Sequence, residues 1–206
     1  MANAQHAPYA QQSGPYTAQT YQRKDEHKAR TGNDHEESYV LTLHTDEEHH
    51  KSMTALRKRY FPPNLNKLDA HIALFRALPG SQLPRITQDV TSLAASQSPF
   101  SINANEAFRM RQGVGIQVVD QSGQAKSIFE KLKQQWKPFL SQQDHSFRAH
   151  YTVQNKVEND ETVNRTLKEL EEQFQGSRGQ VLGLTLYKYD RGHWKKEQDY
   201  SFGGRH

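Results

Sequence analysis

The hydrophobic positions of this chain follow two different periods, and the change between them marks out its elements. Short β-branched runs with apolar residues at alternate positions predict strands at residues 39–43, 68–75, 100–109, 115–119, 147–154, 181–189 and 193–202. Apolar residues at three- and four-residue spacing predict helices at residues 46–60, 81–96, 124–139 and 158–174. The last two strands are expected to form a hairpin through Asp190-Arg191-Gly192.

The order of these elements nearly repeats. Each half contains a strand with a distinctive histidine, then a helix, then an antiparallel pair of strands. This order predicts a bilobal α+β fold, in which two antiparallel-rich sheets face a central cleft and the helices lie on the outside.

The N-terminal segment differs from the rest of the chain. Residues 1–38 contain no Leu, Ile, Val, Phe or Trp, so they cannot bury enough apolar surface to offset the entropy lost on ordering. We therefore expect a disordered polar tail at 1–38 and one folded, two-lobed domain at 39–206.

Composition excludes several classes of protein. The chain has 206 residues and no cysteine, which excludes a disulfide framework, a thiolate nucleophile and a zinc knuckle. No apolar stretch suits a signal peptide or a membrane span, so we expect a protein of the cytoplasm or nucleus, not secreted and without a membrane partner. We also expect a monomer. No glycine-rich phosphate loop is present, and we expect no cofactor.

Charge adds a weaker indication. The tail holds four of the 27 Lys and Arg residues and five of the 23 Asp and Glu residues, which leaves a domain with a net charge of +5. A modestly basic domain tolerates a polyanionic ligand and can attract one, although many ordinary domains carry this charge.

Two of the predicted strands carry a histidine in an apolar run. His71 lies in the segment 69–75 and His150 lies in the segment 147–153, 79 residues later. Strand alternation places His71 with Ala73 on one face, and His150 with Arg148 and Thr152 on another. If these faces align, two imidazoles meet over a shared groove.

Such a pair suits phosphodiester chemistry. The unperturbed pKa of histidine is about 6.5, so one ring can accept a proton from the attacking group while the other protonates the leaving oxygen. Donors aimed at the non-bridging oxygens stabilise the transition state, and Thr152 with a nearby cation would serve.

The segments His71-Ile72-Ala73-Leu74 and His150-Tyr151-Thr152-Val153 resemble the two His-x-Thr/Ser-x motifs of the 2H phosphoesterase superfamily, which includes the 2′-5′ RNA ligase-like proteins and cyclic phosphodiesterases. The resemblance spans roughly residues 38 to 203. It implies a metal-independent hydrolase of phosphoric diesters, with His71 and His150 as the catalytic pair and Thr152 as a phosphate donor. The implied substrate is a 2′,3′-cyclic phosphate or a 2′-5′ linkage of a nucleotide or RNA end.

The first motif departs from this pattern. Ala73 stands where the family has Thr or Ser and cannot donate a hydrogen bond from its side chain. We expect another donor to replace it, with Arg148 as the first candidate and Arg76, Tyr187 and Tyr189 behind it.

Two other readings stay open for the domain. A non-catalytic RNA- or nucleotide-binding module could have kept the cleft, and a tailed interaction protein could use the histidines structurally. His44, His49 and His50 beside three acidic residues are better explained by a solvated first helical turn than by a metal site, so no metal ligands are assigned.

Overall fold

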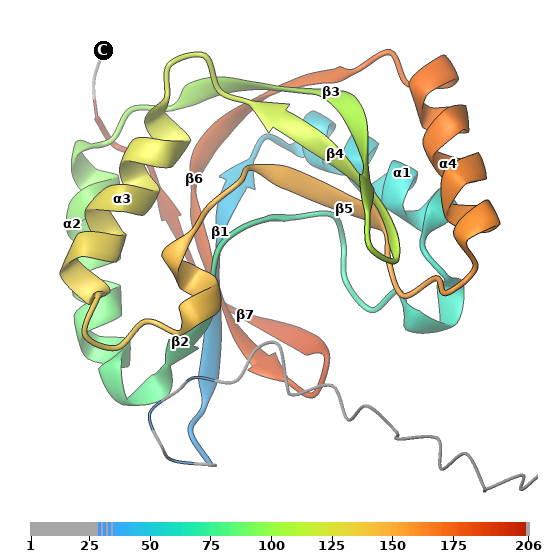
Figure 1. Ribbon diagram of the computed structural model, residues 1–206. Coiled ribbons are helices and arrows are strands. Elements are labelled where there is room, and N and C mark those ends of the chain that lie inside the picture. The colour runs from blue at the N-terminus through green and yellow to red at the C-terminus, as the bar shows by residue number, and fades with distance from the viewer. Residues whose placement is uncertain (1–28, 30, 32, 34, 205–206) are drawn as a thin grey trace, which may run out of the picture.

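The chain folds into strands and helices in the predicted order (Figure 1). The structure is a computed structural model that describes residues 29, 31, 33 and 35–204. The strands are β1 (Ser38–Thr45), β2 (Ile72–Pro79), β3 (Phe100–Met110), β4 (Gly113–Val119), β5 (His150–Gln154), β6 (Ser177–Asp190) and β7 (His193–Ser201). The helices are α1 (Glu47–Tyr60), α2 (Leu83–Ser96), α3 (Gln124–Trp136) and α4 (Asp160–Gln173), with short 3₁₀ helices at Pro63–Leu65, Gly80–Gln82 and Gln142–His145.

Local signals explain several of these boundaries. Asp46 caps α1 by accepting a hydrogen bond from the His49 backbone N–H at 3.0 Å, and Asn159 caps α4 in the same way. The β6–β7 hairpin turns at Arg191 and Gly192, which both have positive φ, as a tight two-residue turn requires.

The strands form one hydrogen-bonded sheet in the order β2-β1-β6-β3-β4-β5, with β7 also paired to β6. The long strand β6 joins the two halves. Its first residues pair with β3, its later residues pair with β7 along the same edge, and β1 runs along the other edge. The α+β class is confirmed, and the strands of the two halves are continuous through β6.

Helices cover the sheet in two pairs (Figure 1). Helices α2 and α3 pack together on one side of the molecule, where α2 also contacts β6 and β7, while α1 contacts β5 and β6 and α4 contacts β3 and β4 on the other. Phe75, Phe129 and Trp136 pack together in the core of the α2–α3 side. The indole Nε1–H of the fully buried Trp136 donates to Asp89 at 2.8 Å.

The segment before β2 differs from the prediction. A strand was expected from residue 68, but β2 begins at Ile72. The preceding residues are held by side chains of α1 instead of by a strand partner: Arg57 donates to the Leu68 carbonyl at 3.1 Å and Thr54 accepts from the Ala70 N–H at 3.2 Å.

His49 also differs from the prediction. It was expected in a solvated first turn, but the residue is 1% exposed and its ring contacts Ser177 through Nδ1.

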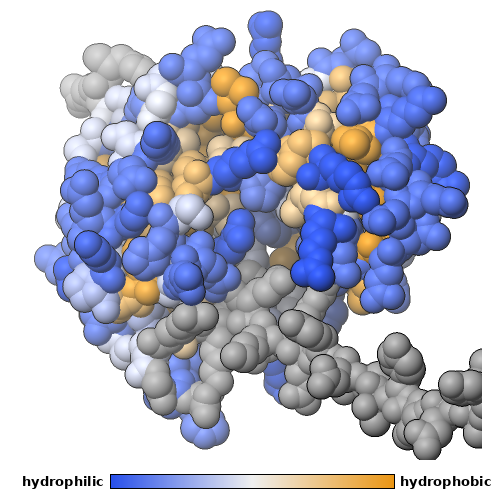
Figure 2. All heavy atoms as spheres, in the orientation of Figure 1, coloured by the Kyte–Doolittle hydropathy of each residue, from blue (hydrophilic) through white to orange (hydrophobic). Residues whose placement is uncertain are grey.

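Residues 1–28 of the predicted tail lie outside the described residues. Two acidic residues near the end of the predicted tail, which runs to residue 38, contact the folded domain. Glu36 accepts from the Ser81 N–H at 2.7 Å, and Glu37 pairs with Lys188. The face drawn in Figure 2 is mainly hydrophilic, and Leu65 is the one exposed large hydrophobic residue in the described part of the chain. No helix among the described residues has the length and apolar character needed to cross a membrane.

Candidate active site

His71 and His150 line the same cavity, which has a volume of about 710 Å³. His71 immediately precedes β2, whose Phe75 stacks on Phe129 of α3, and His150 opens β5, which contacts α1. Ala73 and Thr152 line the same cavity. The fold therefore brings together the two segments that the sequence singled out.

The two imidazoles are held by the same kind of hydrogen bond, each to a backbone carbonyl two residues earlier in the chain. Nδ1 of His71 lies 2.8 Å from the carbonyl oxygen of Asp69, and Nδ1 of His150 lies 2.7 Å from the carbonyl oxygen of Arg148. A carbonyl oxygen only accepts hydrogen bonds, so these contacts assign the proton of each neutral ring to Nδ1. In both neutral rings the lone pair is then on Nε2, the nitrogen that can take up a further proton.

The surroundings of His150 favour its neutral form. Burial lowers the pKa of His150, and the positive charges of Arg76 and Arg148 lower the same pKa further, against the opposing effect of the Arg148 carbonyl. His150 is therefore suited to accept a proton near neutral pH.

A β-bulge determines which residues of β2 face the cavity. Strict alternation from Ala73 would place Phe75 on the same face. The pairing with β1 shifts by one residue between Ala73 and Phe75, and again between Phe75 and Leu78. Phe75 is consequently buried in the core, and Arg76 lines the cavity with Ala73.

Arg148 does not line this cavity, although it was the first candidate to replace the missing donor at Ala73. Its guanidinium lies 4.0 Å from the centre of the Phe108 ring and donates to Gln117 at 3.0 Å. The expected alternation does not extend to Arg148 because β5 begins only at His150. Of the other candidates, Arg76 and Tyr189 line the cavity.

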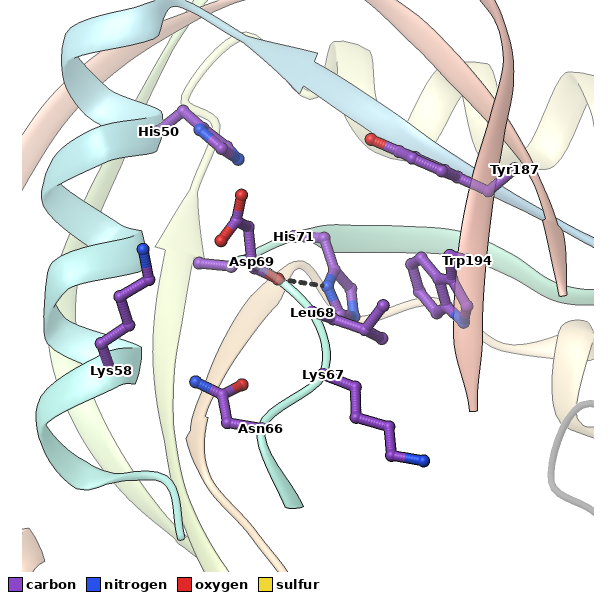
Figure 3. Close-up of a pocket in the computed structure, with 10 residues that line it drawn as sticks. His50, Lys58, Asn66, Lys67, Leu68, Asp69, His71, Tyr187 and Trp194 are labelled. Carbon is purple, nitrogen blue, oxygen red and sulfur yellow. Dashed lines mark hydrogen bonds between the residues drawn. The ribbon is translucent and has the colours of Figure 1, made fainter. Parts of the chain in front are cut away.

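Tyr187 lines a second cavity of about 420 Å³ beside His71 (Figure 3). His71 and Trp194 line both cavities, and their ring centres are 4.3 Å apart. Figure 3 shows His50 and Lys58 projecting from α1 across from Tyr187 and Trp194. The rings of Tyr187 and Trp194 therefore lie next to His71, one of the two histidines.

The larger cavity is positively charged, which the sequence did not indicate. Five of its lining residues are basic and none is Asp or Glu; the basic residues are Arg57, Lys67, Arg76, Lys156 and Arg191. They come from separate loops and elements, so no local run of charge marks them in the sequence. Lys156 adopts a left-handed conformation (φ 62°), which is unusual for a lysine and can mark a functional position.

Arg57 connects the segments that carry the two motifs. Its guanidinium donates to Asn66, to the Leu68 carbonyl and to the Thr152 carbonyl, and its burial lowers its pKa to about 10. One side chain of α1 thus contacts both the loop that leads to His71 and the strand of His150.

No cluster of three or more His, Asp or Glu side chains placed to hold a metal ion occurs among residues 29, 31, 33 and 35–204.

Comparison with known proteins places this arrangement in context. The model of the 2′-5′ RNA ligase superfamily matches residues 45–193. Similar solved structures include the protein TT0787 of Thermus thermophilus (15% identity, 83% of this chain, 100% of that chain, TM-score 0.56). E. coli LigT complexed with 3′-AMP is 13% identical over 81% of this chain and 98% of that chain, with a TM-score of 0.57. A protein described as a phosphoesterase is 14% identical over 81% of this chain and 98% of that chain, with a TM-score of 0.55. No curated protein matches the sequence.

Proposed function

Because this chain belongs to the 2′-5′ RNA ligase superfamily, we propose that it cleaves a 2′,3′-cyclic phosphate or a 2′-5′ phosphodiester at a nucleotide or RNA end. The observation that carries this proposal is the cavity itself, in which two identically held imidazoles lie among five basic residues and no carboxylate. A nucleotide also binds one protein of similar fold, since E. coli LigT was crystallised with 3′-AMP.

In the proposed reaction, His150 acts as the base and His71 as the acid. Nε2 of neutral His150 takes a proton from a water molecule as the water oxygen attacks phosphorus. Nε2 of protonated His71 gives its proton to the departing ribose oxygen as the P–O bond breaks. This reaction needs no metal ion because the two histidines supply both proton transfers.

Thr152 and Arg76 are the proposed donors to the non-bridging phosphate oxygens. Both line the cavity, and Arg76 lies three residues beyond Ala73 on the same strand. The Arg76 guanidinium would stabilise the charge that a Thr or Ser at position 73 otherwise stabilises.

The proposal is tested by His71→Ala and His150→Ala, assayed on 2′,3′-cyclic nucleotides and a 2′-5′ dinucleotide with a chelator present. Each variant should lose roughly 10²- to 10⁴-fold in kcat while its fold is retained by circular dichroism. His193→Ala is the matched control, since His193 is exposed and lines neither cavity. Turnover at the wild-type rate in both single variants would reject the proposal.

Ala73 favours a second candidate function, a nucleotide- or RNA-binding module of the same fold. In that case the wild-type protein should bind a cyclic phosphate without turning it over, and Ala73→Thr should raise its activity.

A further inference from the structure

A buried carboxylate from another segment binds the backbone of β2 at the bulge. Oδ1 of Asp144 accepts from the Arg76 backbone N–H at 2.7 Å, and Oδ2 accepts from the Ala77 backbone N–H at 3.1 Å. In a regular strand, consecutive N–H groups point to opposite edges of the sheet. A single carboxylate can bind both only where the strand departs from that alternation.

Asp144 is built into this position. It is 1% exposed, it lies in the short 3₁₀ helix Gln142–His145, and Oδ2 also accepts from the Ser141 hydroxyl at 3.1 Å. Burial raises the pKa of this carboxyl, and its three hydrogen bonds act in the opposite direction. Asp144 does not line the cavity, whereas its neighbour Gln143 does.

The two sides of the bulge are held differently. Phe75 is fixed by the core, where it stacks on Phe129 with ring centres 5.0 Å apart. Arg76 faces the cavity, and β2 is the terminal strand of the sheet, so no other strand within the described residues pairs with its outer edge. Asp144 supplies the acceptors that a neighbouring strand would otherwise provide.

We propose that Asp144 is a positioning residue that turns the Arg76 guanidinium toward the reaction centre by fixing the β2 bulge. The inference rests on the proposed function for the role of Arg76. Without the carboxylate, two N–H groups at the bulge lose their partners, which favours a return toward regular alternation. Regular alternation turns residue 76 away from the face of Ala73.

The test is a double-mutant cycle read from the His150 ring by NMR titration. Arg76→Gln should raise the His150 pKa, because it removes a nearby positive charge that lowers it. Asp144→Asn keeps the side-chain size but turns one of the two acceptors into a donor, so it should raise the same pKa. In the double variant, the His150 pKa should be no higher than in Arg76→Gln alone.

Arg148→Gln is the matched comparison. Arg148 also lowers the His150 pKa, but it does not contact Asp144. Its effect should therefore add to that of Asp144→Asn. Additive shifts for Asp144→Asn with Arg76→Gln, or an unchanged His150 pKa in Asp144→Asn, would overturn the assignment.

This readout is independent of turnover. If the wild-type protein cleaves no substrate, the proposed function fails, and the NMR cycle still decides the role of Asp144. If turnover is observed, Asp144→Asn should lower kcat more than it changes KM and should have little further effect in Arg76→Gln.

Two further variants separate positioning from loss of stability. Asp89→Asn removes a carboxylate that binds Trp136 in the core, away from either cavity, and should leave the His150 titration unchanged. If Asp144→Asn does not fold, Ser141→Ala replaces it, since it removes only the hydroxyl that binds Oδ2. Ser141→Ala should raise the His150 pKa by a smaller amount, and no rise in that variant would count against the proposal.

Discussion

At the residue scale, the two walls of the cavity present different groups to a phosphate. Thr152 follows His150 by two positions, whereas Ala73 follows His71 and offers no side-chain donor. Loss of one such donor costs roughly 2.7–4 kcal/mol of transition-state stabilisation in enzymes that use an oxyanion hole. Arg76 can offset that loss because the bulge places it on the face of Ala73.

Ala73→Thr should consequently change kcat/KM less than about 10-fold in the wild-type protein, where Arg76 already acts. Arg76→Gln should lower kcat/KM about 100-fold. Adding Ala73→Thr to that variant should raise kcat/KM again by about 10-fold or more. Kinetics of the two single variants and the double variant measure this rescue. An equal gain in both backgrounds would show that Arg76 does not replace the missing hydroxyl.

The pH dependence of the reaction follows from the environment of His150. Burial and two cations lower its pKa below the ordinary 6.5, so its neutral, proton-accepting form persists below that pH. The acidic limb of kcat/KM should therefore lie below about pH 6.5 and should move up in Arg76→Gln. A pH–rate profile checks this, and a limb above pH 6.5 in the wild-type protein would contradict His150 as the base.

Some of the cavity residues were predictable from the sequence and others were not. His71, Thr152 and His150 were predicted from short segments whose residue types already indicate the chemistry. Arg148 was ranked above Arg76 because strict alternation places Arg148 on the face of His150, whereas the same period places residue 75, and not Arg76, on the face of Ala73. The bulge that reverses this depends on pairing with β1 and on Asp144, which is 68 residues away in sequence.

At the element scale, the helices and the final hairpin were predicted well because their hydrophobic periods and end signals are local. The start of β2 was placed too early, since the segment before it alternates apolar and polar residues as a strand does but is held by α1. The burial of His49 also depends on a distant residue. A Cβ at Gly179 would lie 2.4 Å from Cγ of His49, so only glycine leaves room for that ring.

Gly179→Ala should destabilise the protein by about 1–3 kcal/mol, because the added methyl overlaps a fully buried ring. Gly203→Ala is the matched control, since a Cβ there has its nearest contact at 3.6 Å. Urea denaturation of both variants measures the difference. Equal stability of the two variants would mean that the His49 ring moves aside at no cost.

At the scale of the whole molecule, the positive charge of the cavity arises only on folding. Its five basic residues are spread from Arg57 to Arg191, and the net charge of the chain is only +4. No property of the linear sequence shows that their side chains converge on one cavity that no Asp or Glu lines. The fold class was predictable from the order of elements, but this distribution of charge was not.

Substrate binding should therefore weaken as salt is added. For an oligonucleotide ending in a cyclic phosphate, KM should rise with salt more steeply than for a cyclic mononucleotide. Lys156→Gln should reduce the slope of KM against salt concentration for the oligonucleotide. Lys168→Gln should not, since Lys168 lies on α4 outside the cavity. Identical slopes for Lys156→Gln and the wild-type protein would exclude Lys156 from contact with the oligonucleotide.

The long strand β6 has a consequence for how such a protein can be divided or fused. Both halves of the molecule use the same backbone segment as an interior strand, so neither half is complete without it. Cutting the chain between the halves would leave one piece with an unpaired edge and the other with a strand in surplus. Insertions are better tolerated at exposed connections such as the Asp120–Gly123 turn, which lines neither cavity.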